Sequence, residues 1–169
     1  GPMEELMPIL KERRLQGKEP EFVVGSLAER LDPRLFFPGT KSVVMTAVNY
    51  FSSASLPGKG SQGYLSRSAW GLDYHWVMKD MLEKLGQSLS ALEPRLQYKA
   101  FVDIGPLVER ELARRAGLGW IGKNASLITP QFGSWVFLGG LAVNVELEQD
   151  KPLNVAGCGS CRRCIDACP

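Results

Sequence analysis

The sequence lacks the features of a membrane protein, a disordered tail or a protein that binds nucleic acid through its overall charge. No run approaches the roughly 20 apolar residues of a membrane-spanning helix. The longest, from Val136 to Val143, is short and contains two glycines. Twenty basic and eighteen acidic residues give a formal net charge of +2, so contact with a polyanion would depend on local patches. There are no internal repeats and no low-complexity segments. We therefore expect a globular protein without membrane contact.

The chain also shows no export signal. Its first residues, Gly1-Pro2-Met3, are typical of the remnant that a tag-removing protease leaves behind. We accordingly expect a cytoplasmic protein, in which the four cysteines serve as metal ligands or redox groups in preference to disulfides. A length of 169 residues predicts one domain with at most a small appendage, and we expect a monomer.

Hydrophobic periodicity predicts an α/β fold in which helices flank a sheet. The predicted helices cover residues 4–16, 73–92 and 106–117, and the predicted strands cover residues 42–50, 97–103, 126–129 and 134–147. The strand at 42–50 is apolar without alternation, which predicts burial on both faces. Residues 17–40 and 52–68 are predicted to be mostly loop because glycine, proline and serine interrupt them. The chain turns polar and then cysteine-rich after Gln149, which places a domain boundary near residue 150.

The most specific motif is a cysteine run that ends in proline. Cys158, Cys161, Cys164, Cys168 and Pro169 have the spacing C-x2-C-x2-C-x3-C-P. Bacterial ferredoxins use this run for [4Fe-4S] clusters, and its fourth cysteine ligates the second cluster. Zinc sites usually separate two C-x2-C pairs by a dozen or more residues, so we favour an iron–sulfur cluster over zinc or disulfides. Two clusters need about twice the four cysteines present. We therefore expect a fragment whose parent protein carries a second cysteine run.

Asp103 is a candidate general acid. It ends the predicted strand at 97–103, just before Gly105 and Pro106. Ligands of open α/β sheets bind beyond the carboxyl ends of the strands. A carboxyl group in that place can donate a proton if burial or an apolar ligand keeps the proton on it. The alternative is a helix N-cap or an ordinary loop carboxylate.

The segment AGLGWIGKN at 116–124 carries three glycines and one lysine. The glycines would let the backbone approach a ligand closely, and Lys123 would supply a charge for a phosphate or carboxylate. A tight, well-packed connection is the alternative. The charged residues at 109–115 are interpreted as a solvated helix face. His75 is interpreted as a surface or capping residue, although a role as a metal ligand stays open.

These motifs together resemble the epoxyqueuosine reductase family. The matching stretches are residues 30–33, 41–50, 66–71, 73–75, 102–106, 116–124 and 133–168. The combination of AGLGWIGKN with the cysteine run carries the resemblance. It implies a nitroreductase-related cobalamin-binding domain at 4–150, followed by the start of a ferredoxin-like module at 151–169.

The resemblance also implies a function. Members of the family reduce epoxyqueuosine to queuosine in the anticodon loop of tRNA. Reduced cobalamin removes the epoxide oxygen, and two [4Fe-4S] clusters pass on electrons from an external donor. The resemblance implies that Asp103 is the proton donor. It also implies cobalamin contacts, and those residues are Arg30, Ser66, Asp103, Lys123, Ser126 and Leu138. The four cysteines would ligate the clusters, incompletely in this chain. The family binds cobalamin without a histidine below cobalt, which favours the surface reading of His75.

Three other hypotheses stay open. The chain could be a corrinoid-binding or trafficking domain without redox turnover, although the cysteine run argues against that for the parent protein. A generic electron-transfer module would leave the first 150 residues without a purpose. An enzyme like the corrinoid reductive dehalogenases is the third hypothesis, but AGLGWIGKN fits the tRNA enzyme better.

Overall fold

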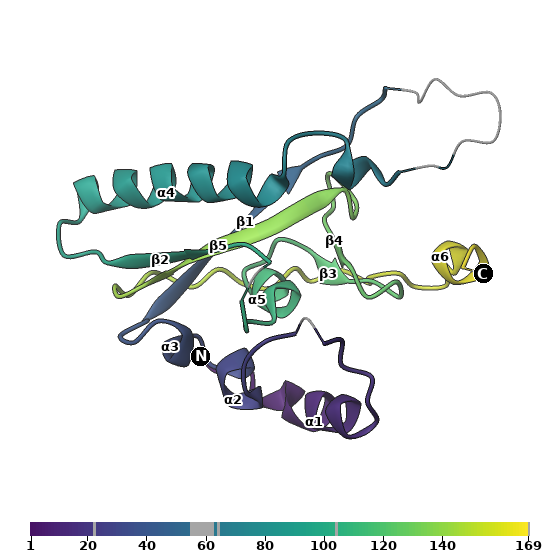
Figure 1. The fold of residues 1–169 in the computed structure, drawn as a ribbon, viewed down its shortest axis with the longest axis horizontal. Coiled ribbons are helices and arrows are strands. Elements are labelled where there is room, and N and C mark those ends of the chain that lie inside the picture. The colour runs from purple at the N-terminus through teal and green to yellow at the C-terminus, as the bar shows by residue number, and fades with distance from the viewer. Residues whose placement is uncertain (22, 55–62, 64, 104, 169) are drawn as a thin grey trace.

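The fold is built around β5 (Val136–Val143), the central strand of a three-stranded sheet in this computed structural model (Figure 1). The structure describes residues 1–21, 23–54, 63, 65–103 and 105–168. β5 pairs antiparallel with β1 (Ser42–Asn49) along one edge and with β2 (Tyr98–Phe101) along the other. The sheet order is therefore β1-β5-β2, and the mixed α/β class predicted from the sequence is confirmed.

The remaining elements are short except for one helix. They are η1 (Glu4–Leu6), α1 (Met7–Leu15), α2 (Leu27–Leu31), α3 (Pro33–Phe36), η2 (Arg67–Ala69), α4 (Tyr74–Leu92), α5 (Glu109–Arg115), β3 (Trp120–Ile121), β4 (Leu127–Ile128) and α6 (Arg163–Asp166). β3 and β4 form a separate two-stranded sheet. Among the described residues, no helix is long and apolar enough to cross a membrane.

Two clusters of apolar side chains lie on opposite faces of the sheet. Met78 and Leu82 of α4 pack with Leu141 and Val143 of β5 on the face that α4 covers (Figure 1). The other face packs against α5 and the amino-terminal helices, through residues that include Met45, Phe101 and Leu112. Burial of these side chains removes apolar surface from water, which is the main driving force for folding.

Residues 17–40 contain more helix than expected. Ser26 accepts the backbone N–H of Glu29, and the Glu29 carboxylate accepts the backbone N–H of Ser26, a capping box that begins α2. Asp32 caps α3, whose first residue is Pro33. The described part of this segment is still mostly loop, as predicted, and the two short helices begin where these local start signals lie.

β1 packs on both of its faces, as predicted: Val43 and Met45 belong to one apolar cluster, and Val44 and Val48 belong to the other. Of these side chains Met45 is buried and the three valines are partly buried.

Two other expectations need correction. The helix predicted to start at Pro106 begins at Glu109, since the chain bends to bury Leu107 first. β3 lies within AGLGWIGKN, where no strand was predicted. Part of the predicted loop at 52–68, residues 55–62 and 64, lies outside the described residues.

The glycines of AGLGWIGKN are packing glycines. A Cβ atom on Gly119 would lie 2.2 Å from the Ile128 carbonyl oxygen. Gly117 ends α5 with φ +76°, and a Cβ atom there would lie 2.7 Å from the Lys151 carbonyl oxygen. The chain after β5 therefore runs close along this segment before it reaches α6 (Figure 1). The structure therefore favours a tight, well-packed connection at 116–124 over a glycine loop that approaches a ligand.

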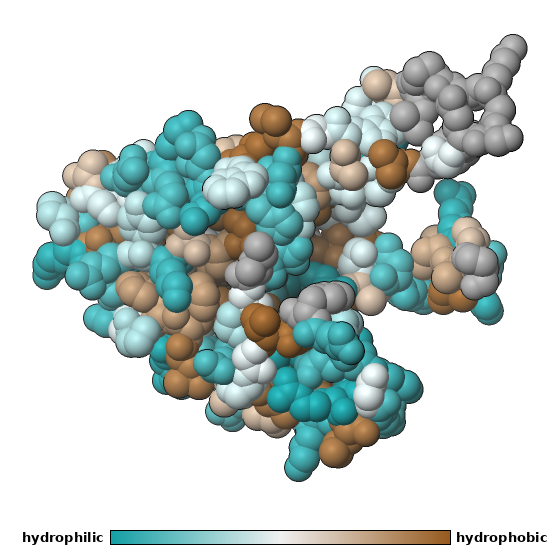
Figure 2. Space-filling model, in the orientation of Figure 1, coloured by the Kyte–Doolittle hydropathy of each residue, from teal (hydrophilic) through white to brown (hydrophobic). Residues whose placement is uncertain are grey.

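The two ends of the chain lie in different surroundings. Met3, the last residue of the expected protease remnant, is fully buried, and its N–H donates to the Leu31 carbonyl at 2.8 Å. The space-filling view shows the segment around α6 standing clear of the main body (Figure 2). Residues 151–169 were predicted to form a separate module, and that boundary stays a prediction.

Candidate functional site

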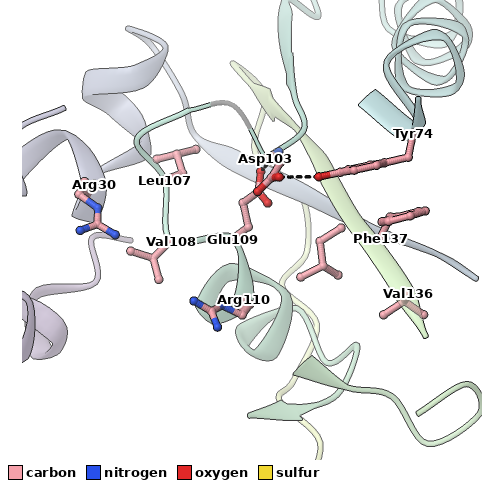
Figure 3. Close-up of a pocket in the computed structure, with 10 residues that line it drawn as sticks. Arg30, Tyr74, Asp103, Leu107, Val108, Glu109, Arg110, Val136 and Phe137 are labelled. Carbon is pink, nitrogen blue, oxygen red and sulfur yellow. Dashed lines mark hydrogen bonds between the residues drawn. The ribbon is translucent and has the colours of Figure 1, made fainter. Parts of the chain in front are cut away.

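A cavity of about 310 Å³ opens beside the carboxyl end of β2. Its walls come from parts of the chain that lie far apart in sequence, as Figure 3 shows. The lining residues are Arg30, Tyr74, Asp103, residues 107–110 and residues 136–138. Since neighbouring strands of the sheet are antiparallel, this is not the parallel-sheet edge from which the position of Asp103 was predicted. The cavity arises where the ends of β2, α4, α5 and β5 meet.

Asp103 presents its carboxyl group to this cavity. The side chain is 62% exposed, and Oδ2 accepts a hydrogen bond from the Tyr74 hydroxyl at 2.5 Å. His75 Nε2 lies 3.5 Å from the same oxygen. The backbone of Asp103 has φ +51°, in the left-handed region that side chains rarely adopt. A reactive type of side chain is thus held in a strained backbone at the edge of a cavity, a combination that is typical of functional sites.

Tyr74 is placed by the start of α4. Asp73 caps that helix through the N–H of His75, so Tyr74 is its first residue. The Tyr74 ring stacks on Phe137 with centroids 4.0 Å apart and on His75 at the same separation. Burial, followed by the hydrogen bond to Asp103, raises the pKa of the Tyr74 phenol. The phenol therefore keeps its proton and serves as a donor to Asp103.

Glu109 is the second carboxylate of the cavity. Its Oε1 accepts the backbone N–H of Asp103 at 2.7 Å. Burial raises the pKa of Glu109 to about 7, and the negative charge of Asp103 acts in the same direction. Glu111, on the same helix, is buried and paired with Arg114 and Arg115. The solvated face predicted for residues 109–115 was therefore wrong for both glutamates.

Two arginines lie on the side of the cavity opposite Tyr74 (Figure 3). Arg110 donates to the backbone carbonyl of Ala125. Arg30 pairs with Glu19, while its buried Nε has no hydrogen-bond partner among the described residues. A buried donor without a partner is costly and marks a place where a polar ligand group would fit. Phe137 and Leu138 also line the cavity and supply an apolar wall.

The predicted cofactor-binding residues do not all meet at this cavity. Arg30, Asp103 and Leu138 line it. Ser126 lies next to Ala125, whose carbonyl accepts from Arg110. Ser66 does not line the cavity, and its Oγ is 2.8 Å from Ser68 Oγ. A corrin contact at Ser66 or Ser126 stays a prediction.

Lys123 contacts the cysteine run. Its Nζ donates to the carbonyls of Gly159 at 2.8 Å and Cys161 at 3.0 Å. The neighbouring backbone of Lys123, followed by the Trp120 side chain, lowers the pKa of the Cys158 thiol. The thiolate is the form that binds metal. A corrin contact for Lys123 also stays a prediction.

The four cysteine sulfurs are not gathered around one point. Cys158 is half-buried, the other three are exposed, and none forms a disulfide. Within the described residues, no group of three or more histidine, cysteine, aspartate or glutamate side chains is arranged to hold a metal ion. The cysteines therefore suit an iron–sulfur cluster in their chemistry and in their spacing along the sequence. The positions of their sulfur atoms in the folded chain do not yet form such a site.

Comparison with known proteins identifies the family. Residues 30–104 match the domain described as epoxyqueuosine reductase QueG, DUF1730. An epoxyqueuosine reductase of Bacillus cereus is 41% identical over 173 aligned residues, which cover 100% of this chain and 45% of that protein. The chain belongs to the epoxyqueuosine reductase family. It spans less than half the length of this relative.

Solved structures of epoxyqueuosine reductases share the fold. One, in complex with an epoxyqueuosine-modified tRNA-Tyr stem loop, matches with a TM-score of 0.90 and 33% identity over 99% of this chain and 45% of its own. Another, from Bacillus subtilis, matches with a TM-score of 0.88 and 32% identity, with the same coverage. That structure is described as having an aspartate catalytic loop swung out of the active site.

Sequence reasoning assigned no role beside Asp103 to several residues that the epoxyqueuosine reductase fold brings there. Tyr74, Glu109 and Phe137 line the cavity, and His75 lies beside it. The sequence could have pointed to Tyr74 and His75, because they directly follow Asp73, the residue that caps α4. Glu109 follows Asp103 by six residues, and no pattern in the sequence distinguishes it from a surface charge. Pairing of β5 with β2 brings Phe137 close, and sequence alone does not give that register.

Proposed function

We propose that the full-length protein reduces epoxyqueuosine to queuosine in tRNA. By the full-length protein we mean this chain together with any further sequence that its gene encodes. The chain belongs to the epoxyqueuosine reductase family. The observation that supports the proposal is that Asp103 lies at a cavity that also contains the protonated Tyr74 phenol, two arginines and apolar side chains. Removal of the epoxide oxygen breaks both of its bonds to carbon, forms a carbon–carbon double bond and releases water. This takes two electrons and two protons.

We propose that the cavity receives one edge of a cobalamin. Arg30 and Arg110 can face the amide or phosphate groups of the cofactor, and the orphaned Nε of Arg30 is a donor for them. Phe137 and Leu138 can pack against the corrin ring. When bound, cobalamin would supply the electrons that remove the epoxide oxygen. A nitroreductase-related architecture for this domain belongs to the same proposal.

Asp103 would act as the general acid. Its carboxyl group would donate a proton to the leaving epoxide oxygen, whose negative charge grows as the carbon–oxygen bond breaks. A ligand that covers Asp103 would exclude water and favour the protonated carboxyl. Tyr74 would keep the carboxyl in place through its hydroxyl.

The cysteine run would contribute to a ferredoxin-like module. Cysteine thiolates hold [4Fe-4S] clusters, and such clusters transfer electrons. In the described residues the side chains of Cys158, Cys161, Cys164 and Cys168 are not grouped to hold a metal ion, so formation of a cluster would need rearrangement and further ligands. An external donor would reduce the clusters. The proposed partner is the tRNA that carries the epoxide, and the proposed location is the cytoplasm.

One assay tests the proposal. Full-length protein is purified anaerobically with cobalamin and supplied with a chemical reductant and epoxyqueuosine-containing tRNA. Formation of queuosine, measured by mass spectrometry of digested tRNA, is the expected result. Bound corrinoid without queuosine under any reductant would overturn the proposal in favour of a corrinoid-binding or trafficking protein. Dehalogenation of a halogenated substrate without queuosine formation would favour the reductive dehalogenase hypothesis.

A further inference from the structure

The backbone of Asp103 needs a partner that holds it. A non-glycine residue at φ +51° occupies a sparsely populated conformation, and such conformations persist only where the surrounding structure enforces them. Aspartate adopts the left-handed region more readily than most residues. That low cost does not by itself explain why Asp103 adopts this conformation, so a specific contact is needed. Because φ at Asp103 directs both its carboxyl and its N–H, the partner of that N–H decides where the carboxyl points.

That partner is Glu109. Its carboxylate accepts the N–H of Asp103 at 2.7 Å, and the side chain is directed toward Asp103 in the cavity (Figure 3). Glu109 is the first residue of α5, which is fixed in the core by Leu112 and Ala113, buried on the next turn. A rigid element thus holds one end of the hydrogen bond, while the strained residue lies at the other.

We propose that Glu109 is a positioning residue that fastens the Asp103 backbone, so that the carboxyl group stays in the cavity. The proposal concerns the same site as the proposed function and, as far as catalysis is concerned, rests on it. Glu109 would not touch the substrate. It would act through Asp103, while Tyr74 holds the carboxyl from the other side.

The hydrogen bond from the Asp103 N–H to Glu109 should depend on pH, because the Glu109 carboxyl group is ionisable. The groups around it are Asp103 on the strand side, Tyr74 and His75 on α4, Arg110 on its own helix, and Arg30 across the cavity. Burial raises the pKa of Glu109 to about 7, the negative charge of Asp103 adds to this, and the hydrogen bond from the Asp103 N–H opposes it. An ionised carboxylate is a stronger acceptor than a protonated one. The hydrogen bond should therefore tighten as the pH rises through neutrality.

The first test needs no cofactor. Backbone amide spectra of the 169-residue chain are recorded by NMR between pH 5 and pH 9. We expect the Asp103 amide to shift with a midpoint near pH 7 and to be protected from hydrogen exchange. Glu109→Gln should abolish that titration but keep the protection, because the amide oxygen of glutamine still accepts a hydrogen bond. Glu109→Ala should speed exchange of the Asp103 amide by about tenfold or more.

The matched control is Glu148→Ala, which removes an exposed glutamate far along the chain. It should leave the titration and the protection of the Asp103 amide unchanged. Equal exchange of that amide in the wild-type chain and in both Glu109 variants would overturn the proposal. If Glu109→Ala does not fold, the loss of titration in Glu109→Gln is the deciding result.

The second test links the fastening to turnover. In the full-length protein, Glu109→Ala should lower kcat by about 10- to 100-fold, because the carboxyl group is misplaced. The KM for tRNA should not change. Glu109→Gln should recover most of kcat and remove the step near pH 7 from the pH profile. An active wild type with an equally active Glu109→Ala would refute the positioning role, whereas an inactive wild type would refute the proposed function and leave the amide result standing.

Discussion

At the scale of single residues, the account depends on how Asp103 is held. Its carboxyl accepts from Tyr74, its N–H donates to Glu109, and its backbone is in the left-handed region. The sequence predicted that Asp103 would end a strand and precede a helix; it lies two residues beyond the end of β2 and six before the start of α5. The partners could not be predicted, because they depend on where α4 and α5 meet the sheet.

Replacement of the proposed acid gives the first prediction. Asp103→Asn keeps the size of the side chain and its acceptor for Tyr74 but removes the proton that the reaction needs. In the full-length protein we expect turnover of epoxyqueuosine tRNA to fall by about 10²–10⁴-fold, while cobalamin stays bound. Absorbance of the purified variant measures the cofactor, and mass spectrometry of tRNA measures turnover. Wild-type turnover in Asp103→Asn would remove Asp103 from the mechanism.

The raised pKa of Glu109 gives a prediction about stability. The folded chain keeps this proton up to about pH 7, whereas the unfolded chain loses it near the ordinary value of 4.5. Between these values the folded state binds more protons, so the contribution of Glu109 to stability falls as the pH rises and levels off above pH 7. From pH 5 to pH 8 the wild type should lose roughly 2–3 kcal/mol relative to Glu109→Gln.

Urea unfolding of both proteins at the two pH values measures this difference. Glu148→Gln, which removes an exposed carboxylate, should follow the wild type. Wild-type and Glu109→Gln stabilities that change in parallel with pH would show that Glu109 titrates normally.

At the scale of elements, the sequence predicted the long helix from its apolar periodicity, which extends over many residues, and it predicted β1, β2, β4 and β5 near their observed places from apolar or alternating runs. It gave no helix for α2 and α3, which are short and begin at local signals, the capping box at Ser26 and the Asp32-Pro33 start. The antiparallel sheet order could not be predicted, since it depends on pairing between β5 and strands 35 or more residues away.

Close packing across β5 gives a prediction at this scale. A Cβ atom on Gly140 would lie 2.6 Å from the Val44 carbonyl oxygen and 2.7 Å from Phe101 Cζ. Gly140→Ala should lower the free energy of unfolding by about 1–3 kcal/mol, because the added methyl group overpacks the sheet. Gly71→Ala, where no atom lies within 4 Å, should have little effect. Chemical denaturation that gives both variants equal stability would contradict this packing.

The contact between Lys123 and the cysteine loop gives another prediction. Lys123→Met removes two hydrogen bonds to the loop that carries Cys158 and Cys161. In reconstituted full-length protein, we expect iron to be lost to a chelator about tenfold more readily than in the wild type. Lys79→Met, at an exposed position of α4, is the control. Identical iron and sulfide retention in both variants would show that Lys123 does not support a cluster.

At the scale of the whole molecule, the chain joins a cavity lined by cations and apolar side chains to a segment that carries four cysteines. The family was recognisable from the sequence because AGLGWIGKN and the cysteine run are specific motifs. The cavity was not, since its walls come from α2, α4, α5 and β5 and converge only in the folded chain. The account as a whole therefore depends on what this cavity binds.

Binding of cobalamin to the 169-residue chain tests this claim most directly. We expect calorimetric titration to give one cobalamin per chain. Leu138→Trp, which fills the apolar wall of the cavity, should abolish binding, and the control Leu35→Trp, at an exposed position of α3, should not. Equal binding by both variants, or no binding by the wild-type chain, would contradict a corrin site over Asp103.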